Sequence, residues 1–375
     1  MNKTEIKKIL VVVPNWIGDA VLAVPAISMI RDNFPKAHIG IIGLPHICEL
    51  FKESPYIDQI YPVDKPSISP FNKGGLRGIW NLANNLRSEK FDMVILFPNS
   101  FRSALIVRLA GIPLRCGYST DGRRLLLNVP VSLDSQVKKL HQTEYYLNIV
   151  SSLESYFSNK IIEQKPTIPL YSPLLKRGDR GDLMGMVGLY LSKDEIQQAL
   201  STLKKNHIAP GSLIIGINPG AAYGSSKRWY SKRFGKVAKV FNERYNAKLI
   251  VFGSQSETDI AEEIDRTADV PLLNMSGKTS IRELMSLISQ CRLFITNDSG
   301  PMHIAAALAV PVVAIFGSTD PQITGPVGDV HIILKKDISC SPCFLRTCPK
   351  GLECMDAISA DDVLDGVEKI LKWVK

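Results

Sequence analysis

Short runs of apolar, mostly branched residues recur along the chain, and each ends in a small polar turn. The runs lie at residues 9–13, 39–43, 93–97, 214–217, 249–252, 293–296 and 312–316. Their apolar character is nearly continuous, whereas a strand with one face in water alternates apolar and polar residues. The pattern therefore predicts strands of a parallel sheet that helices cover on both faces.

Stretches with the spacing of an amphipathic helix follow several of these runs. They lie at residues 20–33, 231–245, 280–289 and 301–308. A strand followed by a helix, repeated along the chain, is typical of a doubly wound sheet. The predicted fold class is therefore α/β.

The strand-and-helix rhythm is interrupted once, between about residues 155 and 212, where prolines and glycines gather around a helix at 192–205. After the interruption a second series begins that resembles the first, so the sequence predicts two Rossmann-like domains that face each other across a cleft. We place the N-terminal domain at residues 1–190 and the C-terminal domain at 191–359. A final helix at 360–375 is expected to pack back on the N-terminal domain.

Composition excludes disordered and fibrous proteins, and net charge favours an acidic partner. The chain has 375 residues, of which 45% are hydrophobic and 22% charged, so it is an ordinary globular protein rather than a disordered or fibrous one. The net charge of +9 favours an acidic partner: nucleic acid, a phosphorylated ligand or an anionic membrane. Nucleic acid is the least supported, because no basic stretch interleaved with aromatic residues is evident.

The apolar segments predict neither a signal peptide nor a membrane span. The first apolar run holds only five residues before Pro14 and therefore suits a buried strand. The longest, at about 304–317, contains Pro311 and is too short to cross a bilayer. We expect a cytoplasmic protein.

The turn after the first strand carries a candidate base. Ligands of doubly wound sheets bind beyond the carboxyl ends of the strands. Gly18 permits a tight turn there, and Asp19 lies near the start of the next helix. Asp19 could cap that helix or act as a general base in the cleft. The turn lacks the Gly-x-Gly-x-x-Gly spacing of a dinucleotide-binding loop.

The turn after residue 217 combines small residues with two cations. Asn218, Gly220 and Ala221 come directly after the strand, and Lys227 and Arg228 precede the next helix. Exposed backbone N–H groups, a helix N-terminus and two cations suit a phosphate cradle, although a solvated basic turn is the alternative.

The turn after residue 296 is the most polar. Asp298 lies at the strand tip and could accept hydrogen bonds from sugar hydroxyls, while Ser299 can cap the helix that follows. Gly300 allows close approach of a ligand to the backbone, and His303 lies one turn into the helix. A similar small polar turn at residues 317–321 could also contact phosphates.

Four of the seven cysteines cluster near the C-terminus, at Cys340, Cys343, Cys348 and Cys354. A structural zinc site is one interpretation, but the spacing matches no standard zinc ribbon, and reduced thiols in a compact loop are the alternative.

Taken in order, these turns resemble glycosyltransferase family 9, the heptosyltransferases of the lipopolysaccharide inner core. The resemblance rests on residues 14–19, 218–221 with 227–229, 297–303 and 340–351, and it spans residues 9 to about 360. It implies a GT-B fold, an ADP-heptose donor held by the C-terminal domain, and a heptosyl-Kdo-lipid A acceptor at the inner face of the inner membrane. It also implies transfer with inversion of the anomeric centre.

The resemblance also implies roles for individual residues. Asp19 becomes the base for the acceptor hydroxyl, and Lys227 stabilises the leaving diphosphate. Asp298 holds the heptose, and Glu257 accepts from the adenosine ribose. The remaining donor-binding residues are Asn218, Gly220, Ala221, Arg228, Ser299, Gly300 and His303.

The acceptor side is assigned to the N-terminal domain. Residues 101–140 hold seven Lys or Arg against two Asp, and Kdo carboxylates and lipid A phosphates are anionic. We expect Trp16, Arg102, Arg123 and Arg124 to bind the acceptor, with peripheral contact to the inner membrane.

No Asp-x-Asp motif, which many metal-dependent glycosyltransferases use to hold a diphosphate, occurs in the chain. We therefore predict that no metal or other cofactor is required. Two alternatives stay open: a GT-B transferase that uses a UDP- or GDP-linked sugar, and a non-catalytic protein that binds sugar nucleotides.

Overall fold

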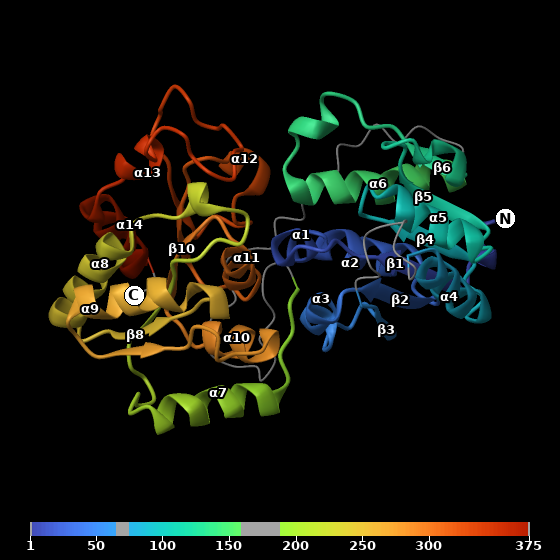
Figure 1. The fold of residues 1–375 in the computed structure, drawn as a ribbon. Coiled ribbons are helices and arrows are strands. Elements are labelled where there is room, and N and C mark those ends of the chain that lie inside the picture. The colour runs from blue at the N-terminus through green and yellow to red at the C-terminus, as the bar shows by residue number, and fades with distance from the viewer. Residues whose placement is uncertain (1, 65–74, 159–187, 374–375) are drawn as a thin grey trace. The chain divides into compact units, whose positions relative to one another are not determined.

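The computed structural model describes residues 2–64, 75–158 and 188–373. The chain divides into two compact units, residues 1–170 and 171–375. Each unit contains one six-stranded sheet in which all strand pairs are parallel, with helices packed on it (Figure 1). Two α/β domains of the Rossmann type are therefore confirmed.

The first unit follows the strand-then-helix order that the sequence predicts. Its strands are β1 (Lys8–Val12), β2 (His38–Gly43), β3 (Gln59–Pro62), β4 (Met93–Leu96), β5 (Leu114–Tyr118) and β6 (Val129–Val131). Its α-helices are α1 (Ile17–Leu22), α2 (Val24–Asn33), α3 (Pro45–Cys48), α4 (Gly75–Ser88), α5 (Phe101–Leu109) and α6 (Gln142–Ser158). Short 3-10 turns are η1 (Lys3–Glu5), η2 (Glu49–Phe51), η3 (Arg123–Leu126) and η4 (Val137–Lys139).

The second unit repeats this plan. Its strands are β7 (Ile214–Asn218), β8 (Lys248–Val251), β9 (Leu272–Asn274), β10 (Leu293–Asn297), β11 (Val312–Ile315) and β12 (Ile332–Leu334). Its α-helices are α7 (Lys193–Lys205), α8 (Ser231–Tyr245), α9 (Thr258–Ala268), α10 (Ile281–Ile288), α11 (Gly300–Ala307), α12 (Pro321–Thr324), α13 (Glu353–Asp356) and α14 (Ala360–Trp373). The 3-10 turns are η5 (Ser225–Lys227) and η6 (Gln255–Glu257).

The two sheets share one strand order. The first runs β3-β2-β1-β4-β5-β6, and the second runs β12-β11-β10-β7-β8-β9, which is the same order read from the other edge. In this order the direction in which successive strands are added to the sheet reverses between β1 and β4 and between β7 and β10, while all strands stay parallel. Ligands of such sheets bind beyond the carboxyl ends of the strands at that switch point. The turns after β1, β7 and β10 are therefore the places to look for function.

Burial explains most of the strands that the sequence predicts, and the fully buried β5 is the exception. All four residues of β4 and β11 and all five of β10 are buried, and these strands were predicted as continuous apolar runs. The edge strands β3, β9 and β12 are only partly buried, and they carry no such run. The apolar run that marks a strand is therefore weaker in strands at the edges of the sheets.

The helix predicted at residues 20–33 is two helices, α1 and α2. The break falls at Ala23, and Pro25 occupies the first turn of α2. Proline has no N–H to donate to the carbonyl four residues earlier, so a continuous helix is disrupted at this point.

The C-terminal helix α14 packs on its own unit. The apolar face of α14 enters the core of the second unit, where Val363, Val367 and Ile370 are fully buried beside residues of α8 and β11. This face is thus used within the second unit, and packing of the helix on the N-terminal domain stays a prediction. The chain divides between residues 170 and 171. Tyr190 contacts the second unit, since its carbonyl accepts from Arg282 of α10 at 2.9 Å. The domain boundary at residue 190 stays a prediction.

Candidate active site

Two buried asparagine side chains tie together the turns after β7 and β10. Asn218, the last residue of β7, is 3% exposed, and its Nδ2 donates to the Gly220 carbonyl and to Ser299 Oγ, both at 3.2 Å. Asn297 ends β10 and donates from Nδ2 to the Pro219 carbonyl at 2.6 Å. Its Oδ1 accepts from the Trp229 backbone N–H at 3.1 Å. Residues about 80 positions apart are thereby held as one site.

A buried ion pair lies at the centre of this site. Lys227 Nζ donates to Asp298 Oδ2 at 2.5 Å, and the two side chains are only 12% and 4% exposed. Thr319, in the turn after β11, donates from Oγ1 to the same oxygen at 2.6 Å. Three turns of the sheet therefore meet at one carboxylate, and the structure brings Lys227 and Asp298 together.

A second carboxylate, Glu257, lies beneath the turn after β7. It closes a capping box on η6, where its Oε2 accepts from the Ser254 backbone N–H at 2.9 Å. Its Oε1 is 3.6 Å from Arg228 Nη2. A Cβ added to Gly220 would lie 2.2 Å from this carboxylate, so only glycine allows such close approach. The structure therefore brings Gly220, Arg228 and Glu257 together, and their roles stay predictions.

The remaining predicted donor residues surround these two pairs. Ser299 is the N-cap residue of α11, Gly300 is its first residue, and His303 lies one turn further on and is 4% exposed. Pro301 occupies the first turn, where the missing N–H costs no helical hydrogen bond. Ala221 is buried, and its carbonyl accepts from Arg228 at 3.3 Å. The N-terminus of α11 adds partial positive charge at this edge.

In the first unit, Asp19 lies in the first turn of α1, directly beyond the end of β1. Trp16, its N-cap residue, is 50% exposed. Burial raises the pKa of the Tyr146 hydroxyl on α6 well above its ordinary value, and the negative charge of Asp19 adds to this effect. Asp19 lies at the switch point of the first sheet, because α1 directly follows β1. Its negative charge acts on Tyr146 of α6. No pattern in the sequence predicts that Tyr146 lies near Asp19.

The burial of Arg123 corrects one prediction. We expected it to bind the acceptor, but the side chain is fully buried. It donates to the Tyr118 carbonyl at 2.6 Å, to the Pro98 carbonyl, and to Asn99 Oδ1 at 3.1 Å. Its guanidinium therefore joins the ends of β4 and β5 and has no surface left for a ligand. The sequence cannot separate it from its exposed neighbour, Arg124, because both follow the same glycine.

A sequence model of glycosyltransferase family 9 (heptosyltransferase) matches residues 79–353. The chain belongs to glycosyltransferase family 9. Lipooligosaccharide heptosyltransferase 2 of Haemophilus influenzae is 31% identical over 337 residues, which are 87% of this chain and 88% of that protein.

Two solved structures share the fold. That of E. coli ADP-heptose lipopolysaccharide heptosyltransferase II has a TM-score of 0.77 at 24% identity, over 98% of this chain and 99% of its own. That of a family 9 glycosyltransferase from Veillonella parvula has a TM-score of 0.79 at 23% identity, over 97% of each chain.

These findings confirm four predictions: the family, the GT-B fold class, glycosyltransferase activity, and heptose transfer in lipopolysaccharide biosynthesis. They leave the roles of single residues as predictions. Within the described ranges, no helix of the heptosyltransferase is both long and apolar enough to span a membrane.

The cysteine-rich segment of the heptosyltransferase has free thiols. Cys340, Cys343 and Cys348 are half-buried and Cys354 is buried, and burial raises the pKa of the Cys354 thiol. In the part of the chain that the structure describes, no group of three or more His, Cys, Asp or Glu side chains is placed to hold a metal ion.

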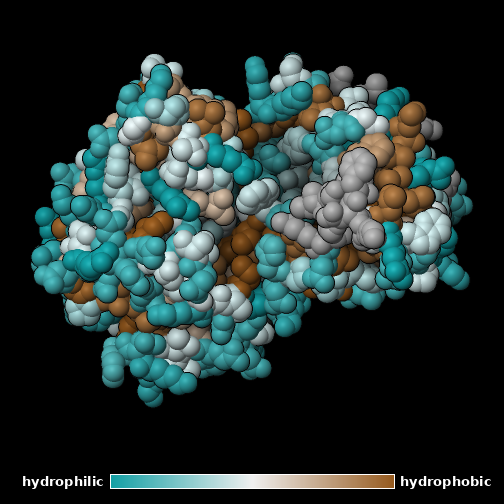
Figure 2. Space-filling view, in the orientation of Figure 1, coloured by the Kyte–Doolittle hydropathy of each residue, from teal (hydrophilic) through white to brown (hydrophobic). Residues whose placement is uncertain are grey.

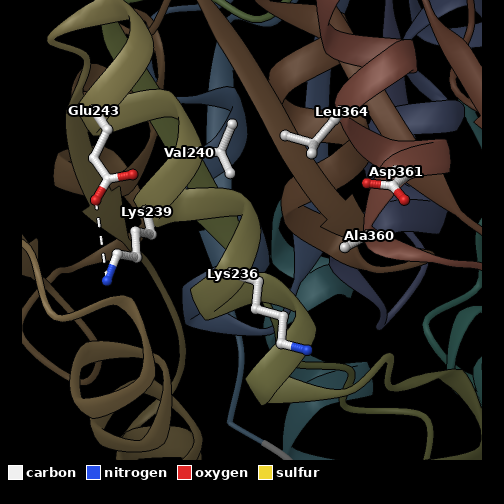
Figure 3. Close-up of a pocket in the computed structure, with 7 residues that line it drawn as sticks. All are labelled: Lys236, Lys239, Val240, Glu243, Ala360, Asp361 and Leu364. Atoms are coloured by element: carbon white, nitrogen blue, oxygen red, sulfur yellow. Dashed lines mark ion pairs between the residues drawn. The ribbon is translucent and has the colours of Figure 1, made fainter.

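A separate pocket of about 310 Å³ lies between α8 and α14 (Figure 3). No predicted site residue lines it. The close-up shows a polar rim on α8, where Lys239 pairs with Glu243 at 4.0 Å. The pocket is lined by Lys236, Lys239, Val240, Glu243, Ala360, Asp361 and Leu364. It lies along the helices rather than at the strand tips, so we do not assign it to the reaction.

The contacts of two residues of the site, Thr319 and Asn297, were not predicted from the sequence. Thr319 was part of a turn expected to contact phosphate, and its hydroxyl instead binds Asp298. Asn297 has no predicted role of its own, although its side chain links two turns. A buried asparagine at a strand end is a usable signal, because its amide must find partners.

Proposed function

We propose that this heptosyltransferase moves heptose from ADP-heptose to heptosyl-Kdo-lipid A and inverts the anomeric centre. The observation that carries the proposal is the Lys227–Asp298 pair at the switch point of the second sheet, beside the N-terminus of α11. A cation, a helix N-terminus and small residues at one edge suit a diphosphate. The name of the E. coli neighbour, an ADP-heptose lipopolysaccharide heptosyltransferase, supports the choice of donor.

The chemical step needs a base and a stabilised leaving group. Asp19 takes the proton of the acceptor hydroxyl, and the hydroxyl oxygen forms a bond to the anomeric carbon of the heptose. The bond from that carbon to the diphosphate oxygen breaks, and its electron pair leaves with ADP. Lys227 and the N-terminus of α11 stabilise this charge, so the step as proposed uses no metal ion.

The second unit also orients the donor. Asp298 holds Lys227 in place and accepts from the heptose hydroxyls, while Gly300 and His303 shape the space for the sugar and diphosphate. Glu257, fixed by the Ser254 cap and beneath Gly220, accepts from the ribose. A carboxylate with both oxygens oriented in this way is a rigid acceptor for hydroxyl groups.

The first unit takes the acceptor and lies at the cytoplasmic face of the membrane. The helix α5 contacts both α4 and η3. Exposed apolar side chains on these three elements are Leu76, Trp80, Phe101 and Leu125, and the exposed cations are Arg77, Arg87, Arg108 and Arg124. Figure 2 shows hydrophobic side chains at the surface of this unit between hydrophilic ones. Apolar anchors among cations suit an anionic bilayer.

Helices that follow parallel strands begin at the carboxyl edge of the sheet, so the starts of α4 and α5 lie at the edge that carries Asp19. A bilayer docked there would present its lipid-linked sugar to the base. Trp16 and Arg102 lie at the same edge and are proposed to contact the acceptor sugars.

The donor and the base are tested separately. Isothermal titration with ADP, UDP and GDP, each with and without EDTA, should give a preference for ADP that persists in EDTA. A preference for UDP or GDP would keep the fold and overturn the donor, and loss of binding in EDTA would overturn the metal-free step.

Asp19→Asn should lower the rate of heptose transfer by a factor of about 10²–10⁴ and leave ADP affinity nearly unchanged, because a base acts in the chemical step. Asp32→Asn, on an exposed position of α2, is the matched control and should transfer heptose normally. Near-normal turnover by Asp19→Asn would remove Asp19 from the mechanism.

Membrane contact is tested with vesicles. The heptosyltransferase should sediment with vesicles rich in anionic phospholipid and not with neutral ones, and the double change Trp80→Ser with Leu125→Ser should weaken binding. Equal binding to both kinds of vesicle, or no effect of the double change, would contradict the proposed surface.

A further inference from the structure

The cysteine-rich segment, residues 340–352, packs across the turns that form the donor site. We refer to it as the cysteine strap. The Cys343 and Phe344 backbone N–H groups donate to the Ser318 carbonyl at 3.1 and 2.8 Å. Ser341 Oγ donates to the Gly317 carbonyl at 2.6 Å. The strap is therefore anchored to the turn after β11, next to Thr319 and its carboxylate partner.

The strap is anchored a second time, to the turn after β7. Tyr223 donates from its hydroxyl to the Phe344 carbonyl at 2.6 Å. The Ser226 backbone N–H donates to the Arg346 carbonyl at 3.1 Å, and Ser226 Oγ donates to the carbonyl of Leu345. Three consecutive carbonyls of the strap are thus held by the same turn that carries Lys227.

The contact at Arg346 is particularly close. A Cβ added to Gly224 would lie 2.2 Å from the Arg346 carbonyl oxygen, so any other residue at this position would push the strap away. The backbone of Arg346 is therefore positioned against the donor turn, although its side chain is exposed.

The side chains of Arg346 and Lys227 share one aromatic ring. The Arg346 guanidinium carbon is 5.2 Å from the centre of the Tyr223 ring, and Lys227 Nζ is 4.8 Å from it. A cation held against a ring face has fewer conformations to lose when it binds a ligand. Tyr223 thus brings a second cation to the neighbourhood of Lys227.

The charges of the site show why a second cation matters. Lys227 is paired with Asp298 at 2.5 Å, and Arg228 lies 3.6 Å from Glu257. These two cations are thus balanced by two carboxylates. Over the residues that the structure describes, Arg346 forms no ion pair with a carboxylate. It therefore supplies the excess positive charge next to these pairs.

We propose that Arg346, presented by the cysteine strap and Tyr223, binds the diphosphate of the donor and of the departing nucleotide. This inference rests on the proposed use of a diphosphate donor. A guanidinium offers paired N–H donors that match phosphate oxygens. Arg346 can bind a phosphate without first breaking an ion pair with a carboxylate. Lys227 then acts mainly at the reacting oxygen, while Arg346 holds the diphosphate.

The test measures binding of ADP and adenosine by isothermal titration to four forms of the full chain: wild type, Arg346→Ala, Arg346→Lys and Lys350→Ala. Lys350 is an exposed cation of the same strap and serves as the matched control. Arg346→Ala should weaken ADP binding by about tenfold, the range expected for loss of a charge-assisted hydrogen bond. Arg346→Lys should recover part of the affinity, and Lys350→Ala should bind as wild type.

Adenosine separates a phosphate contact from a structural effect, because it lacks phosphate. Its affinity should be the same in wild type and Arg346→Ala, and raising the salt concentration should reduce the difference in ADP affinity between them. Equal ADP affinity in wild type and Arg346→Ala, or an equal loss of adenosine affinity, would overturn the proposal.

A negative result for Arg346 can be distinguished from a wrong choice of donor nucleotide. If wild type preferred UDP or GDP, the donor would be reassigned, and the same comparison with that nucleotide would still decide the role of Arg346. If wild type bound no nucleoside diphosphate, both proposals would fall.

Discussion

The buried pair of Lys227 and Asp298 allows a quantitative prediction for the free energy of unfolding. Lys227 Nζ is 2.5 Å from Asp298 Oδ2, and the side chains are 12% and 4% exposed. At an effective dielectric constant of about 20, charges this close attract by roughly 6–7 kcal/mol, and desolvation offsets most of this energy. Removing one partner leaves the other charge buried and unpaired, which typically costs about 3–5 kcal/mol.

The perturbation is a double-mutant cycle of Lys227→Met and Asp298→Asn. Each single change should lower the free energy of unfolding by about 3 kcal/mol, the low end of the range. In Asp298→Asn the partly exposed ammonium can turn toward water, and in Lys227→Met the carboxylate keeps the hydrogen bond from Thr319. The double variant should lose much less than the sum, with a coupling energy of about 2 kcal/mol or more.

Urea unfolding at neutral pH, followed by circular dichroism, measures the four free energies. The control is Arg244→Met, whose partner Glu368 lies 3.5 Å away in a pair that is 61% and 32% exposed. Such a pair should contribute less than about 1 kcal/mol. Additive effects of Lys227→Met and Asp298→Asn, within about 0.5 kcal/mol, would refute the reasoning.

Three further predictions follow from single side chains. Gly220→Ala should weaken ADP binding by about tenfold in titration, because the new methyl group must displace Glu257; unchanged affinity would remove that carboxylate from the donor site. Arg123→Leu should lower the free energy of unfolding by about 3 kcal/mol, since one buried and two partly buried acceptors lose their donor, and a melting temperature within about 2 °C of wild type would contradict this. Burial lowers the pKa of His331 to about 4 from 6.5, so the unfolded chain binds the proton first as the pH falls. Stability should therefore be lost between pH 6.5 and 4, by up to about 3 kcal/mol, and a His331→Asn variant that kept the same pH dependence would disprove it.

The pH prediction has a local structural cause. His331 Nδ1 accepts from the Val312 backbone N–H at 3.2 Å, and Nε2 donates to the Val327 carbonyl at 3.0 Å. A proton on Nδ1 would point at the Val312 N–H, which is itself a donor, so the folded state favours the neutral imidazole. The side chain thereby links the start of β11 to the turn that leads into β12.

The fold was largely predictable because parallel strands buried on both faces leave continuous apolar runs. This holds for β4, β10 and β11 but fails for β5, which is equally buried. That strand contains Arg115, whose guanidinium donates to the Ile112 and Pro113 carbonyls, and Gly117. A strand that buries a hydrogen-bonded arginine is interrupted by a charged residue, so its sequence shows no continuous apolar run.

The location of the candidate site was also predictable, since the rule that ligands bind at strand tips needs only the strand ends. The motifs around Asp19, Lys227 and Asp298 each follow a strand, and the structure has them at the switch points of the two sheets. The family resemblance then supplied the chemical roles, which stay predictions until the variants are measured.

What the sequence by itself determined is thus the fold class, the family and the edge of each sheet that carries polar residues. Only the tertiary structure decided which charges are paired and which are buried. Lys227 and Asp298 are 71 residues apart, and Tyr223 and Phe344 are 121 apart. Arg123 and Arg124 are adjacent, yet one is buried and the other exposed. Pairing and burial depend on contacts between distant segments, and no local pattern along the chain encodes them.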